Sequence, residues 1–84
     1  MNAKEFKEVN LRIAENQPQY ETLPVHFDSK DESYPVTMCF QLDEQEQKQV
    51  LETGEIWLTV LTFGKSFHPI AMSCLKPEKF KSNE

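Results

Sequence analysis

The segment 54–74, GEIWLTVLTFGKSFHPIAMSC, constrains the fold of this chain more than any other. Residues 55–63 are predicted to form a strand that is apolar on both faces, since Ile56, Leu58 and Val60 alternate with Trp57, Leu61 and Phe63. Such a strand is typical of the centre of a sheet that is covered on two sides. A turn that contains Gly64 comes next, and residues 70–75 are predicted to return as a second strand. The segment is therefore expected to form a hairpin.

The N-terminal residues 2–15 are predicted to form a helix. Phe6, Val9 and Ile13 recur at helical spacing, and charged residues surround this stripe. The helix is expected to end before Pro18, because the residue that precedes a proline favours an extended conformation.

Two segments with alternating polarity, 20–27 and 34–42, are predicted to pair as an antiparallel hairpin. Pro24 has no N–H to donate to a ladder, so the first segment is expected at a sheet edge or at a bulge. A second helix is predicted from Asp43, its N-cap, to Gly54, its left-handed C-cap.

The elements have the order α-β-β-α-β-β. They predict an α+β fold with a four-stranded, mainly antiparallel sheet and two helices. Residues 1–76 are expected to form a single domain, and residues 77–84 a polar, flexible tail with Phe80 as a candidate anchor. A chain of 84 residues buries only about 60–65% of its unfolded surface, so disulfides, metals or association commonly supply the missing stability.

The composition argues against several classes of protein. Nine basic and fourteen acidic residues give a net charge of −5, and the lysines are scattered, so direct binding of nucleic acid is not expected. The polar start of the chain does not resemble a signal peptide, and the sequence contains no apolar run long enough to span a membrane. A cytoplasmic location with reduced thiols is expected.

Metal and cofactor sites are not predicted. Cys39 and Cys74 are too far apart for a CxxC motif, and neither has a histidine at the spacing of a zinc site. His26 and Cys39 lie on neighbouring predicted strands, which keeps a small thiol enzyme or hydrolase as a third hypothesis. No nearby group would lower the thiol pKa or stabilise an oxyanion, so buried, inert cysteines and no catalytic residues are expected.

The turn at residues 64–69 is the candidate ligand site. Its FGKS sequence resembles the end of a phosphate-binding loop, but Thr59 stands where that loop needs a glycine. Gly64 and Pro69 are expected to shape a turn. Three neighbouring side chains are candidates for binding a small anionic ligand: Lys65, Ser66 and His68.

Trp57, Leu61 and Phe63 share one face of the predicted central strand. The second helix has an apolar face of little more than Val50 and Leu51, which is too small to cover them. An uncovered apolar face is expected to be an interface, either in a homo-oligomer or with another protein. The alternative is that one helix covers each face of the sheet and that Trp57 belongs to the core.

Three segments, YETLPVHF, VTMCFQL and LETGEIWLTVLTFG, resemble those of small bacteriophage and prophage proteins without an established activity. The resemblance covers residues 17–75 and is strongest from Thr53 to Gly64, with Pro69 and Ile70. It implies an accessory or host-takeover protein that acts by binding in the cytoplasm of the host cell, and it implies no catalytic residue.

The expected function is therefore that of a non-enzymatic, phage-type accessory protein without a cofactor. It would inhibit a host defence system by binding a host protein or by sequestering a small nucleotide-like ligand. The alternative is a structural or assembly component of the virion, in which the same apolar face packs into a larger shell.

Overall fold

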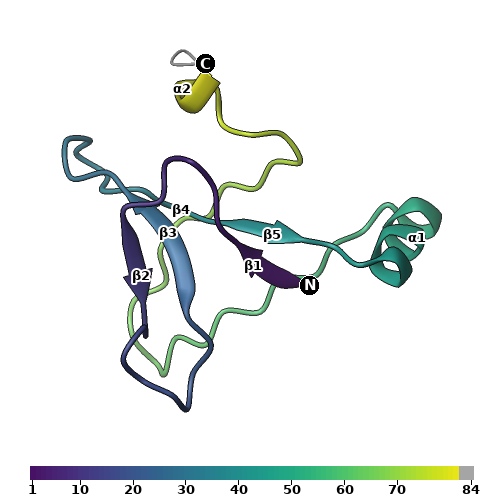
Figure 1. Cartoon of the computed structure of the whole chain (residues 1–84), viewed down its shortest axis with the longest axis horizontal. Coiled ribbons are helices and arrows are strands. Elements are labelled where there is room, and N and C mark those ends of the chain that lie inside the picture. The colour runs from purple at the N-terminus through teal and green to yellow at the C-terminus, as the bar shows by residue number, and fades with distance from the viewer. Residues whose placement is uncertain (82–84) are drawn as a thin grey trace.

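The computed structural model describes residues 1–81 as two small antiparallel sheets and two helices (Figure 1). The expected α+β class is confirmed, but the predicted single four-stranded sheet and its element order are wrong. One sheet pairs β1 with β5, and the other has the order β2-β3-β4. The elements are β1 (Asn2–Lys4), β2 (Leu11–Ile13), β3 (Leu23–Phe27), β4 (Val36–Thr37), β5 (Cys39–Gln41), α1 (Glu44–Thr53) and α2 (Glu78–Lys81).

The helix predicted for residues 2–15 is replaced by β1, a turn and β2. The turn is closed by the Val9 N–H, which donates to the Phe6 carbonyl at 3.2 Å. The Asn10 side chain fixes the position of the chain where β2 begins, because it accepts from the Phe27 N–H at 2.8 Å and donates to the Phe27 carbonyl at 2.9 Å. Ile13 of β2 is β-branched and suits a strand better than a helix. Pairing with distant strands therefore outweighs the weak helical stripe.

The predicted hairpin of 20–27 with 34–42 is confirmed for β3 and β4, where His26 lies opposite Thr37, but residues 39–41 pair with β1 in the other sheet. The edge position expected from Pro24 is wrong, since β3 is the middle strand. The Val25 carbonyl accepts from the Asn10 N–H at 3.0 Å and so faces β2. Backbone groups alternate in direction along a strand, so Pro24 faces the opposite side, beyond the end of β4, where no donor is needed.

Helix α1 has the predicted caps. The Asp43 carboxylate accepts from the Glu46 N–H at 2.8 Å, and the Glu46 carboxylate accepts from the Asp43 N–H at 2.9 Å. Gly54 adopts a left-handed conformation with φ of 66° and donates to the Val50 carbonyl at 2.7 Å. The helix projects away from both sheets, and none of its residues, Glu44–Thr53, is buried.

The core is small. Val25 is fully buried in β3, and Phe80 of α2 is only 5% exposed. The Phe80 ring packs edge-on against the His26 ring, with 5.0 Å between centroids, and lies 6.2 Å from the Phe6 ring. Part of the expected tail is thus helical and holds a core residue, whereas residues 82–84 of that tail lie outside the described residues.

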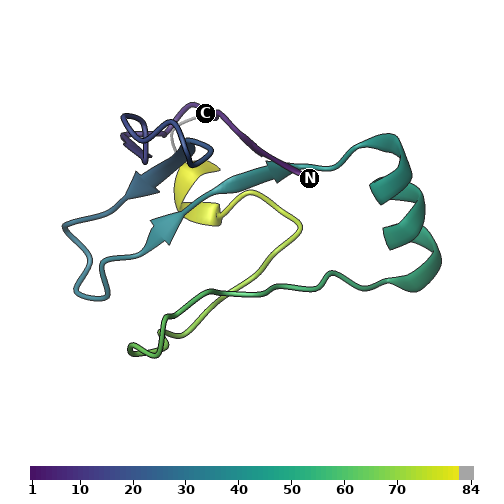
Figure 2. The same ribbon diagram turned by 90° about the horizontal axis from the view of Figure 1, so that it is seen from below.

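The hairpin expected at the centre of the sheet is not formed. Residues 55–75 contain no strand; they cross beneath the two sheets as a separate layer that turns back on itself (Figure 2). A strand that is apolar on both faces needs cover on two sides, and α1 packs against neither sheet. Among residues 1–81, neither helix has the length and hydropathy of a membrane span.

Candidate binding surface

Residues 55–75, which we call the apolar arm, carry the largest group of exposed apolar side chains in the described chain. Trp57 and Phe63 are each 87% exposed and Leu61 is 76% exposed. The arm exposes further large apolar side chains along its whole length: Ile56, Leu58, Val60, Phe67, Ile70, Met72 and Leu75. The indole is therefore not enclosed by its own chain. The uncovered face was predicted only for the first run of the arm, although Ile70 and Met72 already alternate in the second.

The backbone of the arm is largely unpaired. Residues 56–61 and 66–72 make no hydrogen bond with any part of the chain that the structure describes. Their N–H and C=O groups remain open to solvent or to another strand. A row of unpaired backbone groups beside apolar side chains is the condition in which a sheet edge recruits a further strand.

The turn of the arm has the geometry of a hairpin turn. The Lys65 N–H donates to the Thr62 carbonyl at 3.0 Å, and the two residues between them have positive φ, 53° at Phe63 and 77° at Gly64. Two central residues with positive φ define a type I′ turn, which matches the twist of paired strands. The predicted turn at Gly64 is confirmed. Phe63 is an unusual residue for this conformation, and the turn presents its ring to solvent.

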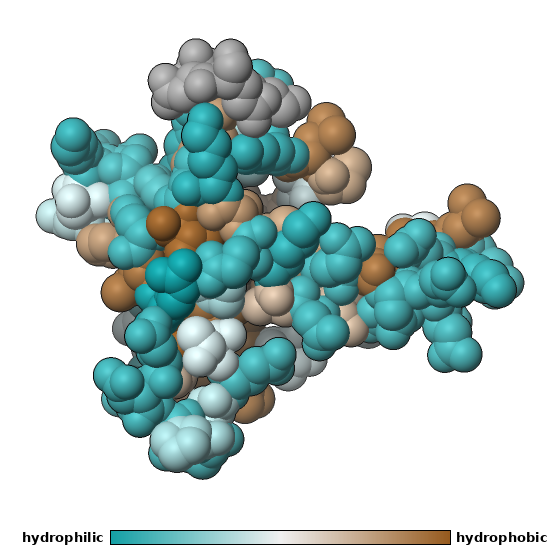
Figure 3. Space-filling model, viewed as in Figure 1, coloured by the Kyte–Doolittle hydropathy of each residue, from teal (hydrophilic) through white to brown (hydrophobic). Residues whose placement is uncertain are grey.

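The arm carries almost no charge. Lys65 is its only Asp, Glu, Lys or Arg between residues 56 and 75, although the whole chain has a net charge of −5. The face of the molecule drawn in Figure 3 is dominated by hydrophilic residues, with hydrophobic residues in small separate groups. The arm passes behind the sheets in that view. The arm is thus a long run of the chain in which exposed apolar side chains meet almost no charge.

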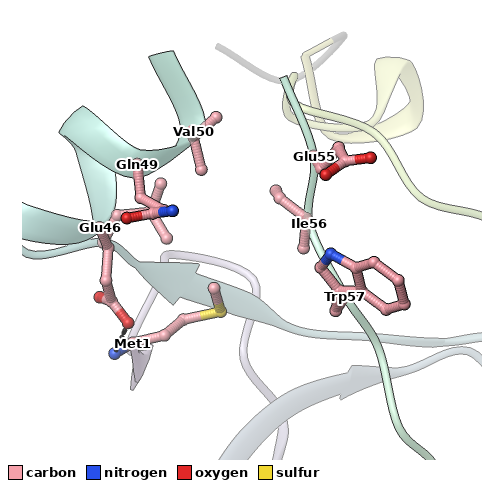
Figure 4. Close-up of a pocket in the computed structure, with 8 residues that line it drawn as sticks. Met1, Glu46, Gln49, Val50, Glu55, Ile56 and Trp57 are labelled. Carbon is pink, nitrogen blue, oxygen red and sulfur yellow. Dashed lines mark hydrogen bonds and ion pairs between the residues drawn. The ribbon is translucent and has the colours of Figure 1, made fainter. Parts of the chain in front are cut away.

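A shallow hollow of about 150 Å³ lies where the arm leaves α1, and its apolar lining includes Val50, Ile56 and Trp57. Figure 4 shows Ile56 turned toward α1, whereas the indole of Trp57 projects away from the helix. At its rim the Met1 amino group donates to Glu46 Oε2 at 2.6 Å. This hydrogen bond raises the pKa of the amino group and lowers the pKa of the Glu46 carboxyl. The only ion pair of the rim is thus already formed within the chain described.

The predicted ligand residues are brought together only in part. Ser66 and His68 line a second hollow, of about 300 Å³, between the two runs of the arm. Lys65 is exposed but does not line it. The remaining lining is mostly apolar and consists of Val60, Leu61, Thr62, Phe67 and Ile70. An anion in this hollow would meet two hydroxyl groups, of Thr62 and Ser66, and the His68 imidazole in an otherwise hydrophobic setting.

The residues of the thiol hypothesis lie in different sheets, Cys39 in β5 and His26 in β3. Both Cys39 and Cys74 are exposed, so the expectation of buried cysteines is wrong. His26 Nδ1 is buried and has no hydrogen-bond partner among the described residues, because the imidazole lies under Phe80. Within residues 1–81, no group of three or more His, Cys, Asp and Glu residues has the arrangement of a metal site.

Comparisons with protein-family models, with curated proteins and with solved structures found no match to this chain. Its function is therefore inferred from its own residues. Its most distinctive feature is the apolar arm, with exposed apolar side chains and a largely unpaired backbone.

Proposed function

We propose that this protein is a non-enzymatic binding protein that acts through the apolar arm. The proposal depends on one observation: a continuous, nearly uncharged segment exposes ten large apolar side chains and an unpaired backbone. Large contiguous apolar patches on small proteins mark interaction sites, and tryptophan is enriched among the residues that dominate binding energy. A phage-type accessory role, in which the arm occupies a host defence protein, is the most concrete form of this function.

The ionisable groups give more support to binding than to catalysis. Catalytic groups commonly have a pKa shifted by burial in a pocket. Here the four shifted groups, Met1, Arg12, Asp31 and Glu46, owe the shift mainly to hydrogen bonds and not to burial. Glu5 raises the pKa of Arg12, and the backbone and hydroxyl of Ser33 lower the pKa of Asp31. These two contacts lie away from the two hollows of the arm, whereas Met1 and Glu46 line the smaller hollow and shift each other through their own hydrogen bond.

The energy available from the arm is large for a chain of this size. Full burial of one large apolar side chain contributes about 1.5–3 kcal/mol. Three or four such residues offset much of the entropic cost of association, which is at least about 4 kcal/mol. Lys65, Ser66 and His68 at the turn would add polar contacts at the edge of that interface, to a protein or to a small nucleotide-like ligand.

Affinity capture from a bacterial lysate tests this proposal. The tagged full-length protein is compared with a Phe67→Ser/Met72→Ser variant, which changes only the second run of the arm. Leu51→Ser is the matched control, since Leu51 is 86% exposed but lies on α1. We expect a partner, identified by mass spectrometry and rebound in purified form, that the control retains and the arm variant loses. Equal retention by both variants, or specific capture by none of the three proteins, would contradict the proposal.

A further inference from the structure

We infer that residues 56–62 of the apolar arm pair with the same residues of a second copy of this chain, as an antiparallel strand pair centred on Thr59. The inference rests on the proposed binding function of the arm and names its first partner, which is the chain itself. The second run of the arm remains available to another molecule.

The exposed area fits an interface between copies. The chain exposes 7674 Å², whereas a compact monomer of 9.8 kDa exposes about 5,200 Å². Its radius of gyration is 14.5 Å, compared with about 12 Å for a compact domain of this length. The excess is about 2,500 Å² per chain, to which the arm and the projecting helix α1 both contribute, and a large obligate homodimer interface buries a comparable area on each subunit. A small ligand would cover far less.

The first run of the arm is better suited to pairing than the second. Residues 55–62 contain no proline or glycine and consist mainly of residues that favour strands. The second run contains Pro69, which cannot donate to a ladder. Residues 56–61 have no hydrogen bond in the described chain, so a partner strand would complete donors and acceptors that are all still open. Two identical strands satisfy this condition in both directions about a two-fold axis.

The sequence selects Thr59 as the centre of this pairing. Antiparallel pairing about Thr59 places Trp57 opposite Leu61 of the partner subunit, on the same face of the sheet. It also places the two Thr59 side chains opposite each other, where threonine pairs interact favourably across strands. Residues 56–62 carry no charged side chain, so two copies of an acidic protein meet where their repulsion is smallest.

A designed disulfide tests this pairing directly. Residues opposite each other in antiparallel strands have Cα atoms about 4.5–5.5 Å apart, within the 4.4–6.8 Å that a disulfide spans. Thr59→Cys is placed in a Cys39→Ser/Cys74→Ser background. Ser66→Cys, beyond the turn of the arm, is the control in the same background. Under mild oxidation at micromolar concentration, we expect most of the Thr59→Cys protein, and at least tenfold less of the Ser66→Cys protein, to become covalent dimer.

Light scattering of the unoxidised proteins completes the test. We expect the wild type, the background variant and both cysteine variants to have twice the chain mass. A monomeric wild type would overturn the inference, and so would a dimer in which Thr59→Cys forms no more disulfide than Ser66→Cys. A monomer that still captures its lysate partner would refute this pairing and leave the proposed function standing. A cross-linked dimer that captures no lysate partner would support this pairing and contradict the proposed function.

Discussion

Helix α1 and the apolar arm are adjacent in sequence, but they differ in where the hydrogen-bond partners of their backbone groups must come from. The helix is polar, and its cap hydrogen bonds join residues no more than four positions apart. The strand pattern in the sequence of the arm is stronger than the helical pattern in the sequence of α1. The arm nevertheless forms only a hairpin turn and no paired strand. A helix satisfies its backbone locally, whereas a strand must find a neighbour. The proposed neighbour of the arm is the same segment of a second copy of this chain.

The largest expected effect comes from the face of the arm that holds Trp57. Trp57→Ser combined with Leu61→Ser removes two central contacts of the proposed strand pair, and truncation of such residues costs about 2–4 kcal/mol each. We expect the dimer dissociation constant to rise at least 100-fold in sedimentation equilibrium. Leu51→Ser, which changes an exposed apolar residue of α1, is the control. An equal weakening of the dimer by Leu51→Ser would contradict the assignment of the interface to the arm.

Phe63 separates the stability of the turn from the binding of the arm. The left-handed conformation strains a bulky residue by about 1–2 kcal/mol, and asparagine tolerates it better. We expect Phe63→Asn to raise the urea midpoint of unfolding slightly and to weaken capture of the lysate partner about tenfold or more. Phe67→Asn, on the far side of the turn, is the control for stability and should not raise the midpoint. A lower midpoint for Phe63→Asn would contradict the turn assignment.

The N-cap of α1 is expected to have a smaller effect, confined to the helix. Asp43→Ala removes the acceptor of the Glu46 N–H, and loss of an N-cap costs about 1 kcal/mol of stability. Urea unfolding monitored by circular dichroism measures this change, with Gln45→Ala as the control inside the helix. The mass in light scattering should stay that of a dimer. An Asp43→Ala protein that becomes monomeric would show that α1 and the arm do not act independently.

The smallest effect is the pH dependence of the contact between Met1 and Glu46. The carboxyl of Glu46 has a pKa below its ordinary value of 4.5, so its contribution is present above pH 4.5 and is lost as the pH falls through the folded pKa. The Met1 amino group has a pKa above 8.0, so its contribution is lost as the pH rises through the folded value. We expect Glu46→Gln to flatten the pH dependence of the unfolding midpoint, and Glu44→Gln to leave it. An unchanged profile for Glu46→Gln would contradict this contact.

The sequence predicts those parts of the fold that depend on local interactions. Asp43 and Gly54 mark the ends of α1, and the alternation of residues 20–27 and 34–42 predicts their hairpin. The helix predicted for residues 2–15 fails because the backbone of Phe27, seventeen residues away, binds Asn10. The spacing of apolar residues within residues 2–15 gives no information about that contact.

The candidate site shows the same division between local and distant interactions. The exposure of Trp57, Leu61 and Phe63 results from the small apolar face of the second helix, which the sequence shows. The positions of Ser66 and His68 in one hollow, with Lys65 outside it, depend on how the two runs of the arm approach each other. The residue pattern within a single run does not determine how the two runs lie relative to each other.

Amide hydrogen exchange in the arm, measured at two protein concentrations, tests most directly whether the arm finds its neighbour in another chain. We expect the amides of residues 56–61 to be protected at high micromolar concentration and to exchange freely after dilution below the dissociation constant. The amides of α1 should be protected equally at both concentrations, because their hydrogen bonds lie within the chain. Free exchange of residues 56–61 at every concentration would contradict the pairing of the arm with a second copy.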